Sequence, residues 1–147
     1  MTRVRRAHLW DLPAILQVLW AFTRRTAWVP NVRAWYTDAR LMARLILRGK
    51  VRVIGGRARA FMCRDGARIL ALYVAPDHRG QGLGAALMAQ AMRQESWLEL
   101  WTFETNEAAR RFYKNCGFRE LSRGNGQGND ECLPDIHMIW QNNEAQR

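Results

Sequence analysis

The chain has 147 residues, 48% of them hydrophobic and 24% charged, which are the proportions of an ordinary globular protein. We expect a single domain over residues 1–147 and neither a membrane span nor a secretory leader, because no apolar run approaches roughly 20 residues and none follows the basic N-terminus. The net charge of +10 favours an anionic partner, although a basic surface without a partner explains it equally well.

The first third of the chain carries one strand pattern and two helical patterns. A short strand is expected over residues 4–7, followed by a helix that Asp11 caps. The apolar residues of this helix recur at helical spacing, at Leu12, Ile15, Leu16, Leu19 and Phe22. A second helix, capped by Thr37 or Asp38, should end at Gly49.

Strand patterns dominate the middle of the chain. They cover residues 51–54, 58–63 and 69–74, and the third is nearly all apolar, as in a central strand covered on both faces. A helix over residues 84–95 and another strand over residues 97–103 follow.

The last third begins with a helix that Asn106 caps and that Gly117 ends in a left-handed conformation. Two strands, at residues 118–121 and 136–140, flank a loop rich in glycine and asparagine. Because strands precede, separate and follow the helices, the sequence predicts an α/β or α+β fold with a mixed sheet.

The segment between the apolar strand and the third helix has the composition of a phosphate-binding loop. Glycines at positions 80, 82 and 84 would let several backbone amides point at one anion. The start of the helix adds a partial positive charge and Arg79 a full one, a combination that suits a pyrophosphate.

Three kinds of nucleotide-binding loop compete for this segment, beside a glycine-rich turn without a ligand. A P-loop would end in Gly-Lys-Ser/Thr, which is absent. A dinucleotide fingerprint is matched loosely by Gly80, Gly82 and Ala85, but five residues separate the strand from Gly80. The coenzyme A pattern Arg-x-x-Gly-x-Gly is filled by Arg79, Gly82 and Gly84, and its position between strand and helix favours it.

A second motif accompanies this loop. Residues 106–118 are similar to the Asn-x-x-Ala-x-x-x-Tyr-x-x-x-Gly-Phe helix of the GNAT superfamily of N-acetyltransferases, and the glycine loop resembles that family's cofactor motif. Residues 100–103 and 129–135 are also similar to those of a poorly characterised bacterial subgroup of small members. The resemblance implies a mixed, mostly antiparallel sheet of about six to seven strands with about four helices on its faces. It also implies transfer of the acetyl group of acetyl-coenzyme A to a primary amine by direct attack on the thioester.

The family's cofactor contacts carry over to two elements. Pantetheine would lie along the backbone of Leu72, Tyr73 and Val74, where an amide could polarise the thioester carbonyl. The other cofactor-binding residues that the resemblance implies are Arg79, Gly80, Gln81, Gly82, Leu83, Gly84, Ala85, Asn106 and Tyr113. Tyr113 would also donate a proton or a hydrogen bond to the departing sulfur, the alternative being a packing role on the core face of its helix.

The general base is where the sequence departs from better-known members, which place a glutamate on the fourth or fifth strand. Residues 69–74 contain no carboxylate. The subgroup resemblance favours Glu131 as the base, with a solvated loop carboxylate or a water relay as alternatives; the other carboxylates considered are Glu99, Glu104, Asp130 and Asp135. Trp28 and Trp35, in a loop expected over residues 24–35, should border the acceptor pocket.

The expected partners are acetyl-coenzyme A and an amine, not a membrane or a nucleic acid, and a homodimer stays open. Three widely spaced cysteines, Cys63, Cys116 and Cys132, predict reduced thiols in a cytoplasmic protein and no metal site. The alternative function is a non-catalytic module that senses coenzyme A or contacts nucleic acid. The candidate acceptors are small-molecule amines and protein amines, and the basic charge argues against polycations.

Overall fold

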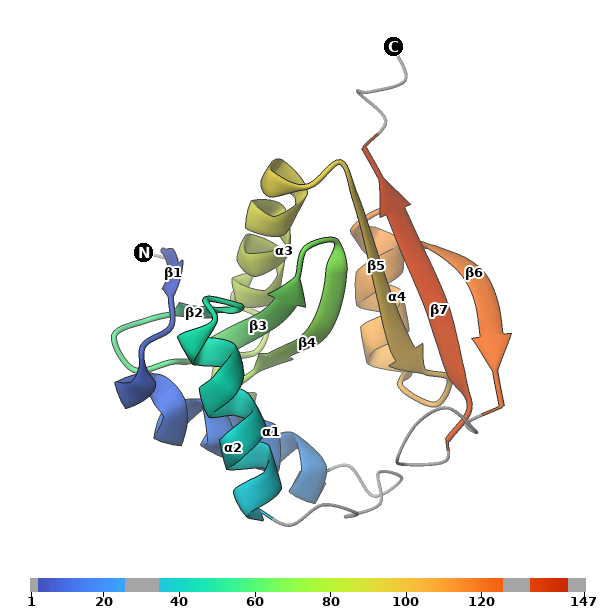
Figure 1. Ribbon diagram of the computed structural model, residues 1–147. Helices are drawn as coiled ribbons and strands as arrows, with labels where there is room; N and C mark the ends of the chain where they lie inside the picture. Colours follow the sequence, from blue (N-terminus) through green and yellow to red (C-terminus); the bar gives the residue numbers. More distant parts are fainter. Residues whose placement is uncertain (1–2, 26–34, 126–132, 143–147) are drawn as a thin grey trace.

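The computed structural model describes residues 3–25, 35–125 and 133–142. These residues form one seven-stranded sheet with four α-helices (Figure 1). The strands are β1 (Val4–Arg6), β2 (Val51–Ile54), β3 (Ala60–Asp65), β4 (Arg68–Val74), β5 (Trp97–Phe103), β6 (Arg119–Gly124) and β7 (Asp135–Gln141). The helices are α1 (Leu12–Arg25), α2 (Trp35–Leu47), α3 (Leu83–Gln94) and α4 (Glu107–Asn115), with 3-10 turns η1 (Leu9–Asp11) and η2 (Pro76–His78).

The strand order is β1-β2-β3-β4-β5-β7-β6, and each neighbouring pair is antiparallel except β4 and β5, which are parallel. This confirms the expected mixed, mostly antiparallel sheet. No helix within residues 3–25, 35–125 and 133–142 has the length and apolar character that crossing a bilayer requires.

The sheet carries helices on both faces, α1 and α2 on one and α3 and α4 on the other (Figure 1). Side chains of β3 alternate between the two cores that result. Ala60 and Met62 pack with the α3 and α4 side, whereas Phe61 and Cys63 pack with α1 and α2. The period-2 alternation of a strand explains why both sets are apolar, since β3 is buried on both faces.

Strand β4 departs from the expectation of a strand covered on both faces. Arg64 pairs with Ile69 and Cys63 with Ala71, so Leu70 is the extra residue of a β-bulge, and it is 49% exposed. Bulges bend a strand and increase its twist. Accordingly, β4 pairs with β5 only before the bulge, through Arg68 and Ile69, and the two strands then separate (Figure 1).

Two predicted helix caps are wrong. Helix α2 begins at Trp35, ahead of Thr37 and Asp38, and Asp38 instead accepts a hydrogen bond from the Trp20 indole at 3.1 Å. Asp11 does not cap α1, because its carboxylate accepts the backbone N–H of His8 and pairs with Arg5. The other predicted elements are confirmed within about three residues at each end.

Candidate active site

The separation of β4 and β5 opens a cleft of about 570 Å³ in the sheet. Its walls come from the two strands, from the beginning of α3 and from one side of α4, and Phe22 of α1 contributes from the opposite face. Elements on both sides of the sheet therefore contribute to the lining of the cleft.

The glycine loop lies at the α3 end of this cleft. Gly80 and Gly82 both have φ of +77°, and no described atom lies within 4 Å of a Cβ built on either. Gly82 is the N-cap of α3 and brings no side-chain cap, so the first amides of the helix are left for an anion. Leu83 is buried in the core, so only its backbone can take part. This open, donor-rich cradle fits a pyrophosphate.

Gly84 serves a different purpose in the same loop. A Cβ at Gly84 would lie 3.3 Å from Cζ of Phe112 and 3.8 Å from Val74. Its hydrogen lets α3 approach α4 and β4 closely, which fixes the loop against the cleft. Both Arg79 and Gly84 line the cleft.

The cleft edge of β4 is suited to an extended ligand. Tyr73 and Leu72 pair with β3 on one edge, while pairing with β5 on the other edge ends at Ile69. Backbone groups on that second edge therefore face the cleft without a neighbouring strand among the described residues. An extended chain with amide groups could bind there as an added strand would.

Tyr113 lies in the wall of the cleft, on the core face of α4. Its side chain is only 8% exposed, with ring centroids 5.5 Å from Phe112 and 5.8 Å from Phe118. Burial, reinforced by the proximity of Tyr73 and Cys116, raises the pKa of Tyr113 above its ordinary value. The phenol thus stays protonated at neutral pH and can act as a hydrogen-bond donor.

Asn106 also lines the cleft, at the beginning of α4. Its Oδ1 accepts the N–H of Ala109 at 3.2 Å, so the predicted helix cap is confirmed. Its contact with a cofactor stays a prediction.

The candidate bases are distributed differently from the sequence expectation. Glu131 lies outside the described residues, as does Asp130. Glu99 pairs with Arg68 and Glu104 with Arg123, and neither lines the cleft. Asp135 is the one carboxylate among the described residues that line it. Asp135 was considered from the sequence but not chosen.

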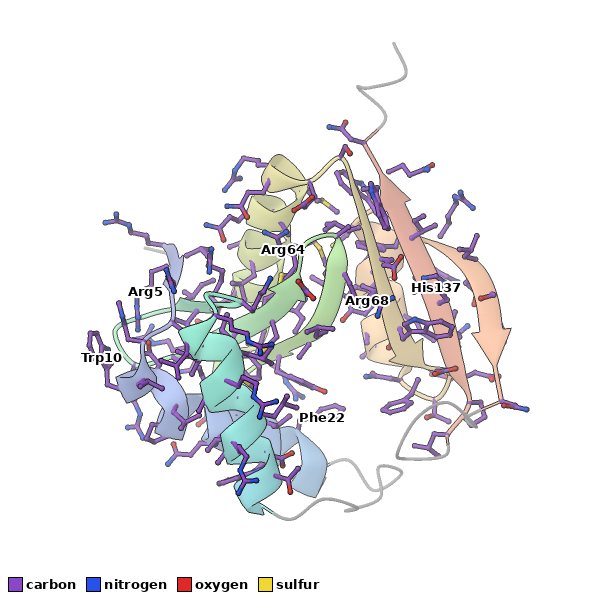
Figure 2. All side chains as sticks on the ribbon, in the orientation of Figure 1. Arg5, Trp10, Phe22, Arg64, Arg68 and His137 are labelled. Carbon is purple, nitrogen blue, oxygen red and sulfur yellow. The ribbon has the colours of Figure 1, made fainter. Side chains whose placement is uncertain are left out.

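The predicted acceptor tryptophans cannot be placed. Trp28 lies outside the described residues, and Trp35 is the first residue of α2, with a side chain that is not described. The aromatic side chains that line the described cleft are Phe22, Tyr73, Trp101, Phe103, Phe112 and Tyr113. The rings of Phe22 and Tyr73 are 4.9 Å apart, and Figure 2 shows Phe22 extending from α1 on the side of β5.

Trp101 was not predicted as a residue of the site, although the sequence pattern indicates that its side chain is exposed on one face of its strand. In residues 97–103 the residues of one alternating set, Leu98, Leu100 and Thr102, are buried, which turns Trp97 and Trp101 to the other face. Trp101 is 49% exposed and stacks on His137 at 4.5 Å with an interplanar angle of 6°. Among the described residues, no group of three or more metal-ligating side chains is present.

Residues 41–120 match the family model described as an acetyltransferase (GNAT) domain. A peptidyl-lysine N-acetyltransferase, YjaB of Salmonella typhimurium, is 32% identical over 80 residues, which are 54% of this chain and 55% of that protein. The chain spans between 27% and 55% of the length of the curated relatives that it matches.

Solved structures share the fold. The apo form of YjaB from Escherichia coli has a TM-score of 0.77 at 21% identity, covering 95% of this chain and 97% of that one. YncA, a putative acetyltransferase from Salmonella typhimurium with its cofactor acetyl-CoA, has a TM-score of 0.75 at 19% identity, covering 96% and 94%.

Proposed function

The chain belongs to the GNAT acetyltransferase family, and from this premise we propose that it transfers the acetyl group of acetyl-coenzyme A to a primary amine. One observation carries the proposal. The cleft between β4 and β5 has an uncapped helix start with open glycines at one end and the protonated phenol of Tyr113 in its wall.

Two parts of the chain would hold acetyl-coenzyme A, which supplies an acetyl group activated as a thioester. The amides of residues 80–85 and the guanidinium of Arg79 would bind the pyrophosphate, because they combine a helix N-terminus with a full positive charge. The cleft edge of β4 at Leu72, Tyr73 and Val74, where pairing with β5 has ended, would bind the pantetheine amides, and Asn106 would border it.

The remaining steps concern protons and the leaving group. The amine nitrogen attacks the carbonyl carbon, the carbon–sulfur bond breaks, and Tyr113 gives a hydrogen bond or proton to the sulfur. Its raised pKa favours hydrogen-bond donation over full proton transfer, because a weaker acid surrenders its proton less readily. The proton lost by the amine goes to Glu131 or to water, a role that rests on the sequence resemblance alone.

The names of two relatives give an order of preference among the candidate acceptors. Since two of them are named peptidyl-lysine N-acetyltransferases, a lysine side chain in a peptide comes first, ahead of peptide N-termini and small amines. A cytoplasmic location belongs to the same proposal, because Cys63 and Cys116 are free thiols. A single acetyltransferase domain over residues 1–147 is also part of this proposal.

The experiment is a thiol-release assay with acetyl-coenzyme A and a panel of lysine peptides, peptide N-termini and small primary amines. The proposal predicts that coenzyme A is released faster in the presence of at least one acceptor class. Release at the same rate with and without every acceptor would contradict it and favour a binding module.

A further inference from the structure

A glycine, an acid and a tryptophan meet where the cleft opens on the helix-free face of β5 and β7. Asp135 pairs with Phe103 of β5 and with Gly124 of β6. Partners in register point to the same face, so Asp135 shares a face with Phe103 and, two residues along, Trp101. The intervening residue Ile136 is buried in the core under α3 and α4.

This face is visible in Figure 2, where His137 lies on the side of β7 away from α4. His137 stacks on Trp101 and holds the indole parallel to its own ring. Trp101 and Asp135 both line the cleft, so the exposed indole and the carboxylate border the same opening.

Gly124 keeps the carboxylate in that position. Oδ1 of Asp135 lies well inside contact distance of a Cβ built at Gly124, and Cζ3 of Trp101 lies 3.9 Å from it. Gly124 is not among the glycines with positive φ, so its backbone conformation is open to any residue. The requirement for glycine is therefore space for the Asp135 carboxylate beside Trp101.

The charges of the cleft separate into two regions. Among its described lining residues only Arg79 and Asp135 are of a charged residue type, and Arg79 belongs to the proposed phosphate loop. A chain of net charge +10 repels cations at long range, so a cationic acceptor needs a local anion to bind.

We propose that Asp135 and Trp101 form the subsite that binds the ammonium group of the acceptor, and that Gly124 is the positioning residue for the Asp135 carboxylate. The carboxylate accepts the ammonium N–H groups, and the indole attracts the positive charge. The substrate class is a primary alkylammonium on an apolar stem, such as a lysine side chain, because the Phe22 and Tyr73 rings also line the cleft. An acceptor with a carboxylate beside its amine, such as a free amino acid, is repelled by Asp135. The inference rests on the proposed function for its statement that the bound cation is the acceptor.

The test measures binding, not turnover, with n-butylammonium and its neutral counterpart n-butanol as probes. The protein, saturated with coenzyme A, is titrated while the indole N–H resonance of Trp101 is followed by NMR, after assignment with Trp101→Phe. We expect saturable shifts with n-butylammonium and much weaker ones with n-butanol. Asp135→Asn should weaken n-butylammonium binding about tenfold, as expected for loss of one charged hydrogen-bond partner.

Gly124→Ala should weaken n-butylammonium binding to a similar extent, because its methyl displaces the carboxylate. Two matched controls should leave binding unchanged. Asp65→Asn removes the same charge from an exposed pair with Lys50, and Gly56→Ala adds a methyl where no described atom lies within 4 Å. A coenzyme A-induced rise in melting temperature in each variant shows that the fold is retained.

Equal binding of n-butylammonium and n-butanol, or equal effects of Asp135→Asn and Asp65→Asn, would overturn the inference. The experiments also distinguish failure of the ammonium subsite from failure of the proposed acetyl transfer. Selective ammonium binding without any acetyl transfer refutes the function and leaves the subsite standing. Acetyl transfer with unchanged ammonium affinity in Asp135→Asn refutes the subsite alone.

Discussion

Replacing Gly82 with glutamine places a side chain in the proposed pyrophosphate cradle without adding charge. Gly82 has φ of +77°, and no described atom lies within 4 Å of a Cβ built there, so the side chain meets open space and the cost is conformational. The left-handed backbone costs an L-residue about 1–2 kcal/mol, offset by about 0.4–1 kcal/mol from the lower entropy of the unfolded chain. The net loss of about 1 kcal/mol lowers the melting temperature by about 2–4 °C for a chain of this size.

Gly66 provides a matched control in the turn between β3 and β4. It has φ of +60° and equally open surroundings, so Gly66→Gln should cost the same free energy without touching the cleft. Acetyl-coenzyme A at a hundred times its dissociation constant should stabilise the wild type and Gly66→Gln by about 2.7 kcal/mol. Gly82→Gln should lose most of that gain.

The assay is differential scanning fluorimetry of the three proteins with and without acetyl-coenzyme A, with calorimetric titration to give the dissociation constants. Equal stabilisation of Gly82→Gln and Gly66→Gln by the cofactor would refute the assignment of the loop. A much larger stability loss in Gly82→Gln than in Gly66→Gln would refute the claim that both substitutions cost only the free energy of the left-handed backbone conformation.

Three further changes probe other parts of the molecule. Tyr113→Phe should lower turnover about 10²–10⁴-fold with acetyl-coenzyme A affinity retained, as calorimetry and the thiol-release assay would show; full activity would return the ring to a packing role. Asp11→Asn should cost about 2–3 kcal/mol near neutral pH, because its carboxylate accepts from Arg5 at 2.7 Å and from the His8 N–H at 2.8 Å. Burial raises the pKa of Asp11, but these hydrogen bonds outweigh it and hold the pKa below its ordinary value. The loss of unfolding free energy in Asp11→Asn, measured by urea denaturation, should therefore shrink as the pH falls below about 4. A loss that does not depend on pH would exclude the ion pair as its source. Trp28→Ala should raise the Michaelis constant for the amine, and a change in stability alone would remove Trp28 from the acceptor pocket.

Local signals explain why α4 was predicted almost to the residue. The Asn106 cap bonds to Ala109 three residues on, and Gly117 takes φ of +104° immediately after the helix. Both are contacts within a few residues, which a sequence pattern carries directly. The signals for the proposed phosphate loop are equally local, since its glycines and Arg79 adjoin the helix that they precede, while its binding of a phosphate stays a prediction.

Nonlocal contacts explain the errors. Asp38 was predicted as a helix cap, but its carboxylate binds the indole of Trp20, a residue of another helix. The apolar pattern of β4 could not reveal the bulge at Leu70 or the end of its pairing with β5, both of which depend on register with neighbouring strands. The meeting of Asp135 with Trp101 likewise depends on pairing between β5 and β7, which are more than 30 residues apart in the chain.

The central claim, acetyl transfer from bound cofactor to an amine, is tested most directly by mass spectrometry of a single-turnover reaction. The wild-type protein, in excess over acetyl-coenzyme A labelled in its acetyl group, is mixed with the acceptor that performs best in the thiol-release assay. If the protein catalyses this transfer, the label appears on the acceptor nitrogen in a one-to-one ratio with free coenzyme A. Label recovered as free acetate, or retained on the cofactor while it stays bound, would contradict it.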